Sequence, residues 1–129
     1  MNQELWLLAL SVVLGLVQIG LASTTQKQQR GRAWYAGSRD EPMPPLTGVA
    51  GRMERALKNY GETFPLFAAV VLVAQAADKH GWLTILGAHL YFWGRVAYVP
   101  TYALGMAYPR SAAWGVATFG IALGLIGLV

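Results

Sequence analysis

The chain has 129 residues, of which 55% are hydrophobic and only 12% charged, and its formal net charge is +4. Soluble domains carry about 25% charged residues, so this composition argues against a water-soluble monomer, and its high hydrophobicity argues against disorder. The absence of cysteine excludes disulfides, thiolate metal sites and a cysteine nucleophile, and two histidines argue against a multi-histidine metal centre. We therefore expect one domain, residues 1–129, in a small all-α membrane protein.

Four apolar segments are predicted to form helices, at about residues 4–23, 47–77, 81–104 and 111–129, with a long first loop at about 24–46. The first segment, Leu5 to Ala22, holds eighteen residues with Gln18 as its only strongly polar side chain. This length is enough to span a membrane. The flank carries Glu4 and no Lys or Arg, which argues against a cleaved signal peptide.

The second segment, Thr63 to Ala77, is too short to span a membrane alone. The stretch before it lacks proline back to Thr47, which we expect to be the N-cap of one long helix with polar first turns. Pro65 is expected to bend this helix, as proline does even in the membrane helices that tolerate it.

The third segment is apolar except for His89, Arg95 and several tyrosines, and Pro100 predicts a second kink. The fourth segment, 111–129, has no charged residue. The turns on either side of the third segment are short. The chain is therefore expected to cross the membrane as four closely connected helices.

The basic residues predict how these helices are oriented. Nine of the ten lie in or beside the first and third loops, and only Lys79 lies at the other end. The positive-inside rule then places those loops in the cytoplasm and both termini outside. Because the basic groups adjoin membrane segments, we do not expect nucleic-acid binding.

A polar stripe enters the second apolar segment. Arg52, Arg55, Asn59 and Glu62 are spaced i, i+3, i+7 and i+10, which places them within an arc of about 80° on one helix face. The carboxylate of Glu62 falls in the apolar zone, where a charge is costly and normally faces a partner or a ligand cavity.

The third segment carries a matching stripe. Tyr91, Arg95, Tyr98 and Tyr102 share one face within about 60°. We expect Glu62 and Arg95 to pair, because that pairing would neutralise both charges. His89 lies off this stripe and is expected to serve helix packing or to contact the lipid interface.

The start of the last helix completes the set of polar candidates. Ser111 is expected to be its N-cap, with Arg110 beside it, and a helix N-terminus with a guanidinium favours an anion. Together with the two stripes, these groups suit a small zwitterionic or anionic peptide-like ligand and an apolar partner dissolved in the membrane. Alternatively, the polar groups form a buried network that only orders the helices.

Three motifs occur together and in order. The first is R-x-x-R-A-x-x-N-x-x-E-x-x-P from Arg52 to Pro65, the second is G-R-V-A-Y from Gly94 to Tyr98 with Tyr102 following, and the third is Arg110-Ser111. With the four-helix layout, this pattern resembles the superfamily of membrane-associated proteins in eicosanoid and glutathione metabolism (MAPEG), over about residues 5–129.

The resemblance implies an antiparallel four-helix protomer, assembled as a homotrimer in the membrane lipid, with glutathione between neighbouring protomers near the cytoplasmic side. The resemblance implies that Arg110 stabilises the glutathione thiolate. In some members a residue that matches Ser111 helps. The resemblance also implies that the tripeptide is contacted by Arg55, Asn59, Glu62, Tyr98 and Tyr102. Arg52 and Arg95 are further binding candidates.

The sequence also departs from the family's enzymes. Lys58 stands where the prostaglandin synthase has a further arginine, and lysine is a poorer bidentate clamp for a carboxylate. Pro100 is not part of the best-known enzymes' pattern. An arginine is expected at the end of the first helix, and Lys27, Arg30 and Arg32 are all candidates. The loop sequence is more similar to a bacterial branch, which predicts a bacterial inner membrane.

Three hypotheses follow. The first is a glutathione-dependent transferase or peroxidase acting on lipophilic electrophiles or hydroperoxides, with Arg110 and Ser111 as catalytic residues. The second is a non-catalytic relative whose polar stripe serves trimer assembly or ligand binding. The third is a small drug/proton antiporter, which the long basic loop and the arginines around Glu62 disfavour.

Overall fold

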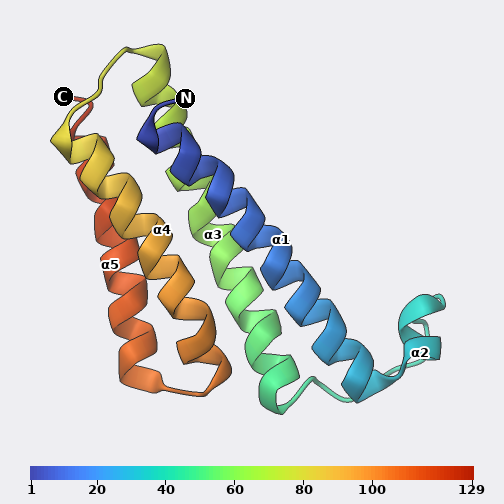
Figure 1. Cartoon of the computed structure of the whole chain (residues 1–129). Coiled ribbons are helices and arrows are strands. Elements are labelled where there is room, and N and C mark those ends of the chain that lie inside the picture. The colour runs from blue at the N-terminus through green and yellow to red at the C-terminus, as the bar shows by residue number, and fades with distance from the viewer.

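The computed structural model describes residues 1–129 and is entirely helical. Its five helices are α1 (Gln3–Arg30), α2 (Arg32–Ala36), α3 (Gly48–Ala76), α4 (Trp82–Ala103) and α5 (Ala107–Ile126). The four long helices lie side by side with both termini at one end, while the short α2 projects from the other end (Figure 1). The prediction of an all-helical fold without strands is confirmed.

The first helix is longer than predicted. It continues to Arg30 instead of ending near residue 23, and α2 occupies part of the expected loop. The segment 23–30 contains no Gly or Pro, and the Thr25 hydroxyl donates to the Leu21 carbonyl at 2.8 Å. The helix ends at Gly31, whose φ of +90° favours glycine because that residue has no Cβ.

The last helix begins earlier than predicted. It starts at Ala107, with Met106 as its N-cap residue, so Ser111 lies inside the helix and is not its N-cap. Pro109 is accommodated in the first turn, where a backbone N–H has no partner within the helix. Arg110 therefore stays near the start of α5, as expected.

The second long helix begins where the sequence predicted. Thr47 is the N-cap residue of α3, although its side chain makes no capping hydrogen bond. Helix α3 continues through Pro65 and α4 continues through Pro100, each without a break in its assignment. Each proline therefore lies inside a single helix that carries one of the polar stripes.

Helices α4 and α5 form the most extensive helix contact in the molecule, and glycine makes it possible. A Cβ built on Gly120 would lie 2.5 Å from the Gly87 carbonyl oxygen and 2.7 Å from the Tyr91 amide nitrogen. Gly94 is similarly close to Ala117. The backbones of α4 and α5 thus touch directly, which is how small residues bring membrane helices together.

Aromatic side chains join α3 to its neighbours. The rings of Phe67 and Tyr91 stack with centroids 4.1 Å apart, and the Tyr91 and Thr63 hydroxyls lie 3.0 Å apart. The buried Tyr60 hydroxyl donates to the Ser11 carbonyl of α1. This layer places the polar stripes of α3 and α4 opposite each other.

A buried carboxylate fastens the first helix at the end where the termini lie. Glu4 is 2% exposed, and its Oε1 accepts a 2.8 Å hydrogen bond from the Thr84 hydroxyl of α4. Its Oε2 lies 3.5 Å from Nδ1 of His80 in the turn between α3 and α4. Half-buried His89 bonds to Gln3 at 2.9 Å, a helix-packing contact.

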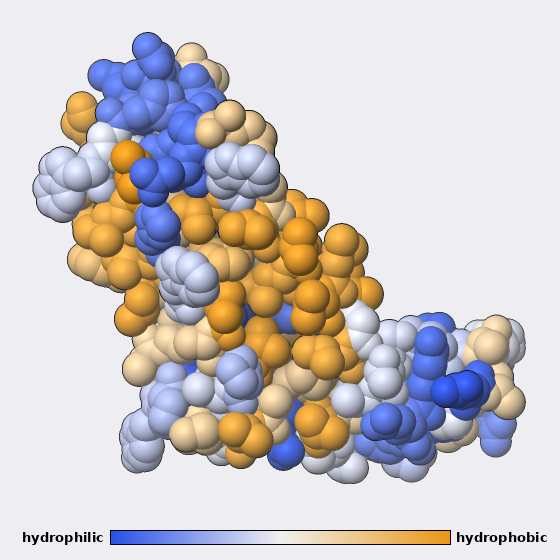
Figure 2. Space-filling model, in the orientation of Figure 1, coloured by the Kyte–Doolittle hydropathy of each residue, from blue (hydrophilic) through white to orange (hydrophobic).

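The surface is apolar around the middle of the long helices and hydrophilic at both ends (Figure 2). Many large hydrophobic side chains are exposed there, including Leu16 and Val17 of α1, Leu72 of α3 and Phe119 of α5. By length and composition, α1 is the one helix that could cross a membrane by itself. The other three long helices are long enough but less apolar than the sequence suggested, because α3 is polar in its first half and α4 and α5 each contain an arginine among their apolar residues.

Gly120→Ala should destabilise the fold by about 1–3 kcal/mol, because its methyl group would overlap backbone atoms of α4. Gly115→Ala on the same helix is the control, since its Cβ would meet no atom within 4 Å and alanine favours a helix by about 1 kcal/mol. Thermal melting in detergent measures both variants. Equal midpoints would contradict the close approach of α4 and α5.

Candidate functional site

A fully buried guanidinium lies at the centre of the two polar stripes. Arg95 of α4 is 0% exposed, and its Nη1 donates to Oδ1 of Asn59 on α3 at 2.8 Å. The guanidinium carbon lies 4.1 Å from the ring centroid of Tyr98 and 5.3 Å from that of Tyr60. Arg95 is therefore held by an amide oxygen and two aromatic faces.

The expected pair of Glu62 and Arg95 does not form. Glu62 is exposed, and Asn59, three residues earlier on the same face, reaches the guanidinium instead. The rings of Tyr60 and Tyr98 lie beside the guanidinium of Arg95. This prediction was wrong because it considered charge alone. Helix packing places Asn59, and not Glu62, level with Arg95 along the helix axes.

Arg95 retains hydrogen-bonding capacity. Its Nε and Nη2 atoms are buried and have no acceptor within the chain. A buried donor without an acceptor costs about 1–3 kcal/mol, so a structure that keeps two of them calls for an explanation. A polar ligand or water beside the stripes would satisfy both.

Two further cations gather around one tyrosine. Nε of Arg55 on α3 donates to the Tyr102 hydroxyl at 3.0 Å, and the Arg110 guanidinium of α5 lies 4.8 Å from the same ring. The Tyr98 ring packs edge-on against Tyr102 at 5.4 Å. With Arg110, Arg55 and Arg95 near these tyrosines and no ion pair to any of them, the cluster favours an anion.

A small cavity lies beside this cluster. It has a volume of about 180 Å³ and is lined by residues from α3, α4 and α5, namely Asn59, Tyr98, Arg110, Ser111 and Trp114. Four of these residues are sequence-predicted candidates, and Trp114 is the addition. Its spacing could have identified it, because a residue at i+4 from Arg110 lies on the same helix face.

Other candidates lie apart from this cavity. Nε of Arg52 donates to the Ala103 carbonyl at 2.9 Å, which satisfies a carbonyl at the end of α4. Glu62 and Lys58 are exposed side chains of α3 and do not line the cavity. The structure therefore brings part of the predicted set together and gives Arg52 a contact within the fold.

The three basic candidates near the end of α1 also do not line the cavity. Arg30 donates to the Pro44 carbonyl at 2.8 Å and lies 5.1 Å from the Trp34 ring, so it holds the loop that follows. Lys27 of α1 and Arg32, the first residue of α2, line a separate cavity between those two helices.

Comparison with protein families identifies the family of the chain. The model of the MAPEG family matches residues 7–129, nearly the whole chain. The chain belongs to the MAPEG family. Members of this family are integral membrane proteins, are generally trimeric and generally use glutathione. No curated protein sequence matches the chain.

Asn59→Ala should destabilise this MAPEG protein by about 1–3 kcal/mol, because Nη1 of the buried Arg95 would lose its only acceptor. Asn59→Asp keeps an acceptor oxygen and should retain more of the stability. Lys58→Ala alters an exposed neighbour and should change little. Thermal melting of the three variants in one detergent is the measurement, and an unchanged midpoint for Asn59→Ala would contradict the contact.

Proposed function

We propose that the chain is a membrane-embedded, glutathione-dependent transferase or peroxidase that acts on lipophilic electrophiles or hydroperoxides. The observation that supports this proposal best is the cavity in which Arg110 and Ser111 face Asn59 and Tyr98. Arg110 is the one basic residue of α5 and lies in its second turn, and the family generally uses glutathione.

Arg110 and Ser111 are the proposed catalytic residues. A guanidinium beside the sulfur lowers the pKa of a thiol and raises its thiolate fraction at neutral pH, and a hydroxyl can donate to the same sulfur. In the transferase reaction the thiolate sulfur bonds to an electrophilic carbon and the leaving group departs. In the peroxidase reaction the sulfur takes the distal oxygen of a hydroperoxide, the alcohol leaves, and a second glutathione forms the disulfide and releases water.

The remaining polar groups are proposed to hold the tripeptide. The Arg55 and Arg95 cations complement its carboxylates, and Glu62 complements its ammonium group. Asn59, Tyr98 and Tyr102 supply hydrogen bonds along its backbone. Arg52 was also a binding candidate, and its bond to Ala103 favours a role in positioning the loop after α4.

A second copy of the chain is proposed to complete the site. The cavity of about 180 Å³ is smaller than the roughly 300–1,000 Å³ of typical ligand pockets, and Arg55 and Glu62 are exposed. A homotrimer of antiparallel four-helix protomers would enclose them and bind glutathione between neighbours. We place loops one and three in the cytoplasm and both termini outside, in a bacterial inner membrane.

The alternative is a non-catalytic MAPEG protein in which the polar stripes serve trimer assembly or ligand binding. The burial of Arg95 against Asn59 and two tyrosines favours this alternative, as does the bond from Arg52 to Ala103. Both are contacts that a purely structural network needs. The two functions differ in what they require of Arg110, whose guanidinium lies over the Tyr102 ring and forms no ion pair within the chain.

Calorimetric titration of glutathione into the detergent-purified protein tests the proposal. Wild-type protein should bind saturably, and Glu62→Gln should bind about tenfold more weakly, because a charge-assisted hydrogen bond is lost. Arg110→Ala should retain binding but lose the ultraviolet absorbance of the bound thiolate. Glu54→Gln, an exposed change on the same helix, is the matched control.

The outcomes distinguish the enzyme from the non-catalytic alternative. If the Arg110→Ala variant kept the thiolate absorbance and the enzymatic turnover of the wild type, Arg110 would not be a catalytic residue. Binding without any thiolate signal in the wild type would favour the non-catalytic alternative. No heat at millimolar glutathione would reject glutathione as the thiol.

A further inference from the structure

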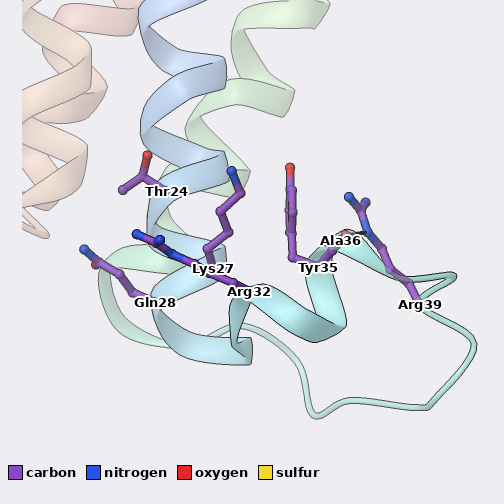
Figure 3. Close-up of a pocket in the computed structure, with 7 residues that line it drawn as sticks. All are labelled: Thr24, Lys27, Gln28, Arg32, Tyr35, Ala36 and Arg39. Carbon is purple, nitrogen blue, oxygen red and sulfur yellow. Dashed lines mark hydrogen bonds between the residues drawn. The ribbon is translucent and has the colours of Figure 1, made fainter.

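The largest cavity of the molecule lies outside the candidate site. It has a volume of about 760 Å³ and lies between the end of α1 and α2 (Figure 3). Its lining residues are Thr24, Lys27, Gln28, Arg32, Tyr35, Ala36 and Arg39. Three of these are basic and none is acidic, and none is shared with the cavity beside Arg110.

Helix periodicity and one turn build this cavity. Thr24, Lys27 and Gln28 lie at i, i+3 and i+4 on one face of α1. The positive φ of Gly31 then redirects the chain so that Arg32 begins a helix beside that face instead of extending α1. Two basic surfaces that are sequential in the chain are thereby folded toward each other.

Tyr35 lies between two of the cations. The Lys27 amine is 4.9 Å from its ring centroid, and the Arg39 guanidinium is 4.0 Å from it. Nε of Arg39 also donates to the Tyr35 carbonyl at 2.7 Å, which holds that side chain in place. The Ser23 hydroxyl lowers the pKa of Tyr35 most, and the charges of Arg39 and Lys27 lower it further.

Two of the three cations point toward the apolar part of the molecule, while Arg32 extends sideways, away from Tyr35 (Figure 3). In Figure 3 the ends of Lys27, Tyr35 and Arg39 all rise along α1, away from the loop below. On the same face of α1 above them, Val13, Val17 and Leu21 are exposed. An anion bound here would therefore lie directly below an exposed apolar helix face.

We propose that this cavity binds the phosphate of an anionic phospholipid headgroup, with the acyl chains along α1. Positive-inside orientation accounts for basic residues near a membrane helix, but it does not account for their convergence with a phenol, an amide and a hydroxyl on one cavity. A cluster of this kind attracts anionic headgroups through each of its cations, and about 760 Å³ is a typical ligand-pocket volume.

Three probes test the proposal on the detergent-purified full chain by thermophoresis: short-chain phosphatidylglycerol, short-chain phosphatidylcholine and inorganic phosphate. Phosphatidylglycerol should bind most tightly. Arg32→Gln combined with Arg39→Gln should weaken it about tenfold or more, because two headgroup contacts are lost. Lys79→Gln, which removes one charge at the opposite end of the molecule, should leave binding unchanged.

Further measurements keep the outcomes separate. Lys27→Gln alone should weaken binding less than the double variant, and it provides a test if the double variant melts at a lower temperature. Equal binding of phosphatidylcholine, or equal loss in Lys79→Gln, would overturn the site. Inorganic phosphate binding as tightly as the lipid would assign the cavity to a free phosphate, and displacement of the lipid by glutathione would assign it to the glutathione site.

Discussion

The burial of one arginine is the constraint on which the middle of this protein depends. A guanidinium without solvent is costly, and Arg95 has no carboxylate to offset its charge. The amide oxygen of Asn59 and the faces of Tyr60 and Tyr98 take that role. Because these partners come from α3 and α4, the cost of burial is offset only when the two helices pack in this register.

That register in turn determines the candidate site. With Arg95 held between the helices, Arg55 of α3 reaches the Tyr102 hydroxyl of α4, and Arg110 of α5 lies over the same ring. Cations from two different helices are thus brought to one tyrosine without ion-pair partners. Arg95, which stabilises the helix pair, lies near Arg55 and Arg110, which are available to a ligand. Mutations at these positions are therefore expected to have non-additive effects.

Periodicity was enough to predict the helices and the two polar stripes, since i, i+3 and i+7 spacings place residues on one face before any packing is known. It could not predict contacts between stripes. Asn59 and Glu62 share a face, and their difference in height, set by packing, decides which of them meets Arg95. The prediction that Ser111 is an N-cap was wrong for a local reason, because Pro109 fits inside the first turn of α5 and the helix begins at Ala107.

The basic cavity beside α2 shows a second limit. The basic residues after the first apolar segment were explained by orientation, and Lys27, Arg30 and Arg32 also by the arginine that the family resemblance implies there. Their convergence depends on the direction in which the chain leaves Gly31, and a positive φ there is not visible in a pattern of polar and apolar residues. The length of α1 matters equally, because Lys27 joins the cavity only if the helix continues past residue 23.

The glycine contact between α4 and α5 has a mechanical consequence. Backbones that touch at Gly87 and Gly120 have no side chains that could rearrange between them, so the two helices should move as a single body. The contact of α3 with α5 is much smaller than that of α4 with α5. Any widening of the cavity beside Arg110 would then require α4 and α5 to shift together relative to α3, a shift that the hydrogen bond from Arg95 to Asn59 opposes.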